Sequence, residues 1–124
     1  MRRLVVIVDD NESAAVSLAL AVEKIPGVEA VVMQHGPAAL RLFQTSDTPI
    51  HAVITDFNLP YLDGFELIRE IRKIPAYRTI PALMVTADRN TSEKNGGTVE
   101  GPNAILYKPF SSREVCRVME KLLQ

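Results

Sequence analysis

The sequence predicts one α/β domain of the (βα)5 type, a doubly wound three-layer sandwich around a five-stranded parallel sheet. Two observations lead to this prediction. Short apolar runs rich in β-branched residues alternate along the chain with segments whose apolar residues recur at helical spacing. Polar residues hardly interrupt these runs, which is typical of parallel strands that helices cover on both faces.

The apolar runs give the positions of the predicted strands, which are residues 4–8, 28–33, 50–55, 80–85 and 103–107. The first helix is predicted over residues 12–25, where Ala15, Leu18 and Val22 recur at helical spacing. Pro26 and Gly27 follow directly, and this pair ends a helix.

Three further helices have recognisable starts. Gly36-Pro37 opens the second helix, where proline is tolerated in the first turn. Asp63 and Ser111 each precede an apolar helical pattern, and each is followed three residues later by a glutamate, Glu66 or Glu114. This spacing is that of a capping box, in which the side chains of both residues satisfy backbone N–H groups at the helix start.

The segment between the fourth and fifth predicted strands is the exception. Residues 88–102 are almost entirely polar, with Gly96-Gly97 near the middle and Val99 as the one large apolar residue. Glycine costs about 1 kcal/mol per helical position relative to alanine. We therefore expect a short or irregular fourth helix, or a mobile loop.

Composition limits the function classes. We expect residues 1–124 to form one domain, and the net charge of −1 gives no reason to expect binding to nucleic acid or to an anionic membrane. The apolar run at residues 4–8 is too short for a signal peptide or a membrane span. Cys116 is the only cysteine, so an intramolecular disulfide is excluded and a cytoplasmic location is expected.

Polar residues follow four of the predicted strands at the point where each strand ends. They are Asp9 and Asp10, Asp56, Thr86 and Lys108. The carboxyl ends of parallel strands share one edge of the sheet, where ligands bind in open α/β folds, so we expect these side chains to converge. Carboxylates placed this close together repel one another unless a cation lies among them. The pattern therefore predicts a site for a divalent metal and a phosphoryl group.

Each residue alone also has a purely structural interpretation. The acidic pair could be an acidic helix start, since Asp is favoured near helix amino termini, and Asp56 could be a turn-forming residue. Lys108 alone would be a solvated lysine. We expect His35 and His51 to lie outside the site and to be solvated.

Four motifs in order distinguish between these interpretations. They are the acidic pair Asp9-Asp10, the D-x-x-L-P-x-x-D-G stretch from Asp56 to Gly64, Thr86-Ala87, and Lys108-Pro109-Phe110. Each motif alone is weak, but together they extend over nearly the whole chain. In these motifs the chain resembles the receiver domain of two-component response regulators, the chemotaxis-regulator-like kind. The resemblance implies a flavodoxin-like strand order of 2-1-3-4-5.

The resemblance implies a role for each residue in phosphoryl transfer. Asp56 would accept a phosphoryl group from the phosphohistidine of a histidine kinase and become an aspartyl phosphate. Lys108 would pair with a phosphoryl oxygen, and Thr86 would turn to hydrogen-bond the same group. Tyr107 would turn inward behind Thr86 as part of the switch.

The resemblance also implies a magnesium site. Asp10 and Asp56 would ligate Mg²⁺ through their side chains, Asp9 through a water molecule and Asn58 through its backbone carbonyl. This set agrees with the preference of Mg²⁺ for one or two carboxylates together with waters and a phosphate oxygen. The Lys108–Pro109 peptide bond would be cis.

The expected partners follow from the same resemblance. The phosphoryl donor would be a sensor histidine kinase or a phosphotransfer protein. The signal would pass to a downstream protein or to an output domain absent from this chain. The chain itself would be either a stand-alone receiver or a receiver cut from a longer protein. Direct binding to nucleic acid or to a membrane is not expected. The chain would assist its own phosphorylation and dephosphorylation without turning over an external substrate.

Two alternatives remain at the level of sequence. The first is a receiver-like interaction module that works without phosphorylation. The presence of all five site residues argues against it, whereas the unusual segment 88–102 leaves it open. The second is a Mg²⁺-dependent phosphohydrolase that works through an aspartyl phosphate. Haloacid-dehalogenase-like enzymes place their acids as D-x-D after the first strand, whereas Asp9 and Asp10 are adjacent here.

Overall fold

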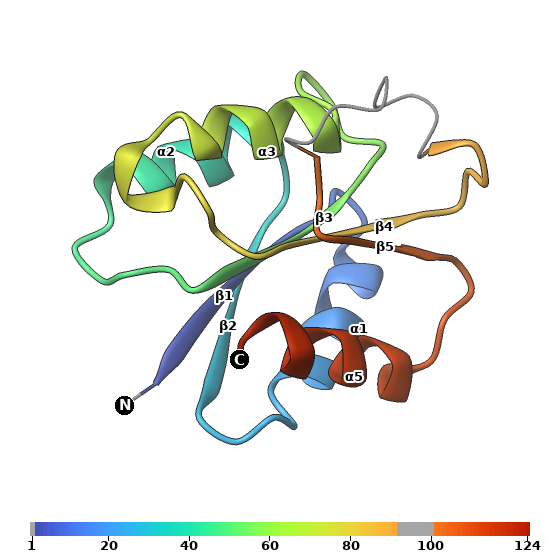
Figure 1. The fold of residues 1–124 in the computed structure, drawn as a ribbon. Helices are drawn as coiled ribbons and strands as arrows, with labels where there is room; N and C mark the ends of the chain where they lie inside the picture. Colours follow the sequence, from blue (N-terminus) through green and yellow to red (C-terminus); the bar gives the residue numbers. More distant parts are fainter. Residues whose placement is uncertain (1, 92–100) are drawn as a thin grey trace.

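The computed structural model describes residues 2–91 and 101–124. The strands are β1 (Arg3–Val8), β2 (Val28–Met33), β3 (Ala52–Asp56), β4 (Ala82–Thr86) and β5 (Ala104–Tyr107). The helices are α1 (Glu12–Val22), α2 (Gly36–Thr45), α3 (Gly64–Arg72) and α5 (Ser112–Leu122), with a short 3-10 helix η1 (Pro75–Tyr77). The strands pair in parallel in the order β2-β1-β3-β4-β5 (Figure 1), which confirms the predicted fold class and order. Most of the predicted irregular segment, residues 92–100, lies outside the described residues.

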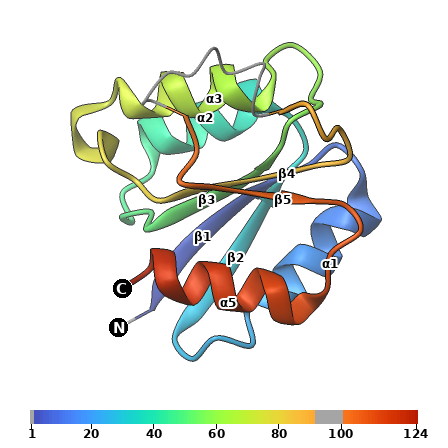
Figure 2. The same ribbon diagram turned by 45° about the vertical axis from the view of Figure 1, so that its right-hand side comes forward.

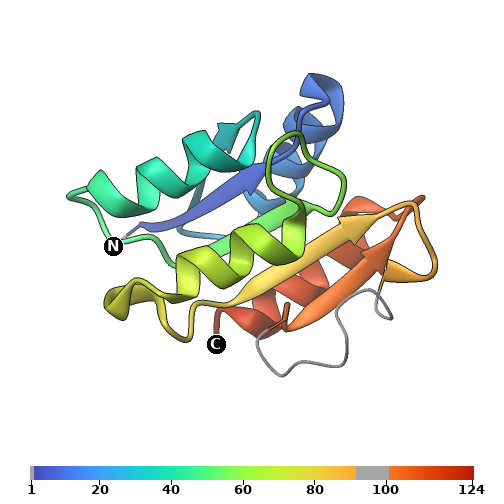
Figure 3. The same cartoon turned by 90° about the horizontal axis from the view of Figure 1, so that it is seen from above.

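Two helical layers cover the two faces of the sheet. Helices α1 and α5 pack on one face, and α2 and α3 lie on the other (Figures 1 and 2). Alternate residues of β1 serve the two layers: Val5 and Ile7 belong to the α1–α5 core, and Val6 and Val8 to the α2–α3 core. All four are fully buried, and burying a side chain of this kind contributes roughly 1.5–3 kcal/mol. In Figure 3 the α2–α3 layer is seen from above, with the two helices beside each other.

The two central strands differ from their predicted bounds at both ends. Strands β3 and β4 extend by one residue to include Asp56 and Thr86, so both polar residues belong to strands rather than to the turns that follow. Residues 50–51 and 80–81 precede these strands instead of opening them. His51, predicted to be solvated, is half-buried, and its Nδ1 accepts a hydrogen bond from the Leu4 backbone N–H at 3.2 Å.

The predicted helix starts are confirmed, with one addition. Asp63 and Ser111 both form complete capping boxes with Glu66 and Glu114. His35, also predicted to be solvated, is half-buried, and its Nδ1 accepts a hydrogen bond from the Ala38 N–H and so caps α2. Asparagine and aspartate are the usual caps, so the pattern gave no signal for a histidine in this role.

Helix α1 ends earlier than the predicted residue 25. Its last residue is Val22, and Lys24 and Ile25 continue as turns whose N–H groups bond to carbonyls three residues back. Pro26 disfavours helical backbone at the residue before it, which explains the early end. The carboxylate of Glu23, the residue after the helix, accepts a hydrogen bond from the Ala30 N–H of β2 at 3.1 Å.

None of the helices in the described ranges has the length and apolar character needed to cross a membrane.

Gly64 brings α3 into direct contact with β3. A Cβ at this position would lie 2.7 Å from the Asp56 carbonyl oxygen and 2.7 Å from the Met84 terminal methyl. The Gly64 N–H also donates to the Phe57 carbonyl at 2.9 Å. The first turn of α3 can therefore approach β3 only because residue 64 has no side chain.

We predict that Gly64→Ala lowers the free energy of unfolding by about 1–3 kcal/mol, because a methyl group cannot fit against backbone without a shift. Urea denaturation measures this. Gly36→Ala is the matched control, since its Cβ would meet the Leu62 side chain at 3.0 Å rather than backbone, and its cost should be smaller. Equal costs for the two variants would contradict the prediction.

Tyr61 adopts a left-handed backbone conformation with φ 75°, although it is 83% exposed. A residue with a Cβ costs roughly 1–2 kcal/mol in this conformation, whereas glycine adopts it freely. We predict that Tyr61→Gly increases the free energy of unfolding by up to about 1 kcal/mol, part of the gain being offset by the more flexible unfolded chain. Urea denaturation measures the change, and Tyr77→Gly is the comparison. That variant removes a half-buried ring without relieving backbone strain, so its free energy of unfolding should fall. A loss of stability in Tyr61→Gly would contradict the expectation.

Candidate functional site

The carboxyl edge of the sheet brings together four of the predicted residues. Strands β1 and β3 are neighbours, with Val8 opposite Thr55, so Asp9 and Asp56 follow this pair side by side. Asp9, Asp10 and Asp56 offer carboxylate oxygens that all lie within 4.8 Å of one another. The Lys108 Nζ reaches this group from the end of β5, 3.3 Å from Asp56 Oδ2 and 4.0 Å from Asp9 Oδ2.

Asp9 is the most buried member of this carboxylate cluster, with a fully buried side chain. Its Oδ1 accepts the Asn11 backbone N–H at 2.9 Å, while its Oδ2 has no hydrogen-bond donor among the described residues. Burial raises the pKa of Asp9 above its ordinary value of 3.8. The negative charges of Asp56 and Asp10 raise this pKa too, whereas the Asn11 N–H and Lys108 lower it. Within the described part of the chain, the charge of Asp9 is therefore poorly compensated.

Asp56 has a side chain that is 10% exposed, enough for access from outside. Its Oδ1 accepts the Asn58 backbone N–H at 3.3 Å, and its Oδ2 faces Lys108. The Lys108 side chain is 32% exposed and so lies at the mouth of the site. The Lys108–Pro109 peptide bond is cis, as expected.

The charges of this site fit a hard cation. Among residues 2–91 and 101–124, one ammonium against three carboxylates leaves a local charge of 1 − 3 = −2. The buried Asp9 Oδ2 lacks a donor in the described part of the chain, and a free lone pair of this kind is suited to a metal or to a metal-bound water. Carboxylate oxygens are the ligands that Mg²⁺ prefers.

Thr86 lies at the same edge of the sheet, but its hydroxyl is hydrogen-bonded to residues of the loop after β4 rather than directed to the carboxylates. Thr86 Oγ1 accepts the Asp88 backbone N–H at 3.1 Å and lies 3.0 Å from Thr91 Oγ1. Thr86 and Thr91 are both fully buried. Thr91 was missed at the level of sequence because it lies in a polar segment where no periodicity shows which side chains point inward.

Tyr107 is half-buried at the end of β5 and is covered by an arginine that the sequence analysis also missed. The Arg89 guanidinium carbon lies 5.0 Å from the centre of the Tyr107 ring. This distance is that of a cation–π contact, which is worth about 0.5–1 kcal/mol at an exposed site. The contact joins the loop after β4 to β5.

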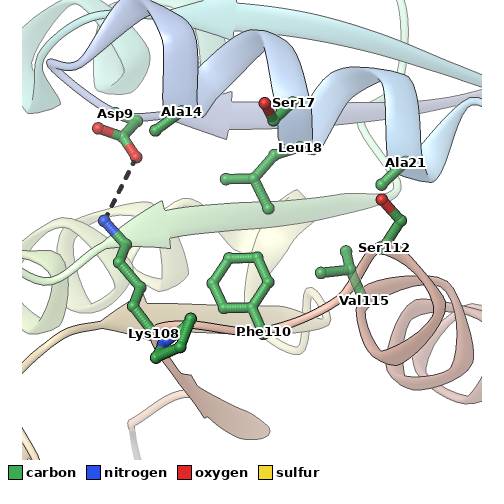
Figure 4. A pocket seen from close by; sticks show the side chains of 10 residues that line it. Asp9, Ala14, Ser17, Leu18, Ala21, Lys108, Phe110, Ser112 and Val115 are labelled. Atoms are coloured by element: carbon green, nitrogen blue, oxygen red, sulfur yellow. Dashed lines mark ion pairs between the residues drawn. The ribbon is translucent and has the colours of Figure 1, made fainter.

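A cavity of about 280 Å³ extends from Asp9 and Lys108 between α1 and α5. Figure 4 shows the Asp9–Lys108 ion pair at one end and the side chains of Leu18 and Phe110 facing each other farther along. Its walls beyond the ion pair are mainly apolar, so they offer little to a phosphoryl group or a metal. The chemistry of the site is therefore located at the carboxylate cluster.

The family model of the response regulator receiver domain matches residues 5–120. The chain belongs to this family. It is a response regulator receiver domain of two-component systems, as its motifs predicted. The family's members are in general phosphoacceptors rather than enzymes, bind Mg²⁺ at an acidic pocket, and interact with histidine kinases and output domains.

Curated relatives of this receiver domain include two kinds of protein. The sensory transduction protein RegX3 of Mycolicibacterium smegmatis is 35% identical over 120 residues, which are 97% of this chain and 50% of the relative. The chain thus spans about half the length of that relative. A chemotaxis protein CheY homologue of Campylobacter jejuni is 26% identical over 94% of this chain and 89% of its own length.

Solved structures agree with the assignment to receiver domains. The chemotaxis response regulator CheY4 of Vibrio cholerae superposes with a TM-score of 0.86 at 26% identity, covering 99% of this chain and 100% of its own. The receiver domain of the sensor histidine kinase PA1611 of Pseudomonas aeruginosa has a TM-score of 0.85 at 25% identity and covers 99% of this chain and 98% of its own. That receiver domain was solved with a magnesium ion coordinated in its active site cleft.

We predict that Asp9→Asn increases the free energy of unfolding of the metal-free receiver domain at neutral pH by about 1–3 kcal/mol, because it removes a poorly compensated buried charge. The folded-state pKa of Asp9 lies above the unfolded value of 3.8. Protonated Asp9 therefore favours the folded state at acid pH, and this contribution is lost as the pH rises through the raised pKa. Urea denaturation from acid to neutral pH measures both effects.

Asp10→Asn is the matched control, because it removes the same charge from an exposed neighbour. Its effect on stability should be smaller and should depend less on pH. Added Mg²⁺ should stabilise the wild-type protein more than Asp9→Asn. Identical stability of Asp9→Asn and the wild type at neutral pH, without Mg²⁺, would show that the buried charge is compensated.

Proposed function

We propose that Asp56 is the phosphoacceptor of this receiver domain and that residues 1–124 act as one phosphorylation-controlled switch. The observation that supports this most is the arrangement around Asp56. Its Oδ2 lies 3.3 Å from Lys108 Nζ, while the carboxylates of Asp9, Asp10 and Asp56 lie within 4.8 Å of one another. A nucleophilic carboxylate, a cation for the phosphoryl oxygens and a metal-ligand set are thus adjacent.

The proposed reaction is transfer from a phosphohistidine of a sensor histidine kinase or a phosphotransfer protein. An Asp56 carboxylate oxygen attacks phosphorus in line with the P–N bond. As the new O–P bond forms, the P–N bond breaks and its electron pair returns to the imidazole nitrogen of the donor. Catalysis of such a transfer is mostly positioning and charge neutralisation, which rigid strand ends provide.

Asp10, Asp56, the Asn58 backbone carbonyl and, through water, Asp9 would hold Mg²⁺. When bound, Mg²⁺ supplies positive charge that offsets the charge on the phosphoryl oxygens. Lys108 would supply a second positive charge by pairing with a phosphoryl oxygen. Two observations on the described residues support this assignment: the Asp9 Oδ2 has no hydrogen-bond donor, and the local charge is 1 − 3 = −2.

Thr86 and Tyr107 would report the phosphorylated state. We propose that Thr86 turns to hydrogen-bond the phosphoryl group and that Tyr107 then moves inward, so that phosphorylation shifts the population between two arrangements. The new surface would act on a downstream protein or an output domain. Direct contact with nucleic acid or a membrane is not part of this proposal, nor is multiple turnover of an external substrate.

We predict that incubation with acetyl phosphate and Mg²⁺ adds one phosphoryl group to the wild-type protein, because a small acyl phosphate can reach the partly exposed Asp56. Intact-mass spectrometry measures the adduct. Asp56→Asn should show none, since an amide cannot form the acyl phosphate. Omission of Mg²⁺ should reduce the adduct strongly.

Asp47→Asn is the matched control, because Asp47 is exposed and lies outside the carboxylate cluster. Its adduct should equal that of the wild type. An adduct that persists in Asp56→Asn would move the acceptor elsewhere. If the wild type forms no adduct with acetyl phosphate and none with a phosphorylated histidine kinase, the result would favour the alternative of a receiver-like interaction module that works without phosphorylation.

A further inference from the structure

Thr91 closes a small buried network around the switch residue Thr86. The Thr91 hydroxyl donates to the Asp88 backbone carbonyl at 2.6 Å and lies at hydrogen-bond distance, 3.0 Å, from Thr86 Oγ1. The Asp88 N–H, in turn, donates to Thr86 Oγ1 at 3.1 Å. The Thr91 N–H also donates to the Asp88 carbonyl at 3.1 Å, so the loop is closed on itself.

These bonds occupy the Thr86 hydroxyl in the phosphoryl-free protein. The single proton of the Thr91 hydroxyl goes to the Asp88 carbonyl, so the bond between the two threonines uses the Thr86 proton, and Thr86 Oγ1 also accepts the Asp88 N–H. Thr86 and Thr91 are fully buried, and a hydrogen bond excluded from water is electrostatically stronger than one in water. Thr86 can therefore bond to a phosphoryl group only if it gives up the bond to Thr91.

We propose that Thr91 is a positioning residue that holds Thr86 in its phosphoryl-free orientation and so sets the balance between the two switch states. The proposal rests on the proposed function, in which Thr86 turns toward the phosphoryl group. A bond made in only one of two states favours that state by its own free energy. Loss of a bond of ordinary strength should then shift the balance about two- to tenfold toward the phosphorylated arrangement.

The first test compares Thr91→Val with Thr91→Ser. Valine has nearly the shape of threonine but no hydroxyl, whereas serine keeps the hydroxyl. The measured quantity is the Kd of beryllium trifluoride in saturating Mg²⁺, since this ion is a tetrahedral stand-in for a phosphoryl group on a carboxylate. Thr91→Val should bind it about two- to tenfold more tightly than the wild type, and Thr91→Ser should bind it like the wild type.

Thr45→Val is the matched control for the loss of a threonine hydroxyl. The Thr45 Oγ1 donates to the Arg41 carbonyl at 2.8 Å in α2, outside the carboxylate cluster and the loop after β4. Its Kd should equal that of the wild type. An unchanged or weaker affinity in Thr91→Val, or the same gain in Thr45→Val, would overturn the proposal.

The second test measures the side-chain orientation of Thr86 in the wild-type protein. Three-bond scalar couplings of the ¹³C-labelled Thr86 methyl group report its χ1 rotamer in the metal-free protein and after addition of Mg²⁺ and beryllium trifluoride. The rotamer should change on addition. An unchanged rotamer with the ion bound would overturn the role of Thr91, while binding itself would leave the phosphoacceptor function supported. Failure of the wild type to bind the ion, with Asp56→Asn giving the same result, would overturn the proposed function and this inference with it.

Discussion

A buried, poorly compensated carboxylate is the constraint on which the site depends. Asp9 follows strand β1 directly, and its side chain is fully excluded from water, while that of its neighbour Asp56 is 10% exposed. The described residues supply Asp9 with one backbone donor and one ammonium 4.0 Å away, which is too far for a strong hydrogen bond. The fold therefore tolerates an electrostatic cost at this edge, and the cost is of the kind that a bound cation relieves.

The ends of the strands place the other site residues relative to the Asp9 carboxylate. These residues are Asp10, Asp56, Asn58, Thr86 and Lys108. Each is the last residue of a strand or lies within two residues of one, so the hydrogen bonds of the sheet determine its position. The loop after β4 is different, because Thr86, Asp88 and Thr91 are joined by side-chain and backbone hydrogen bonds of their own. Fixed groups thus surround Asp56, while the hydroxyl expected to respond to phosphorylation is held by a small set of bonds that can be exchanged.

The strand periodicity and the two capping boxes were sufficient to predict the fold, because parallel strands buried on both faces leave a strong apolar pattern. The motif residues Asp9, Asp10, Asp56 and Lys108 could be placed together because strand ends share one edge. The cap at His35 and the orientation of Thr91 could not be predicted. Both depend on the direction of one side chain in an irregular segment, and local sequence does not determine such directions.

The hydrogen bond between the Glu23 carboxylate and the Ala30 N–H has a consequence for the outer edge of the sheet. Among the described strands, β2 has a neighbour on one side only, and an unpaired backbone edge can template the addition of a strand from another molecule. The Glu23 side chain occupies one of the donors on that edge, and the Arg2–Glu29 ion pair adds charge beside it. The start of β2 is therefore protected against edge-to-edge aggregation by Glu23, the residue that directly follows α1.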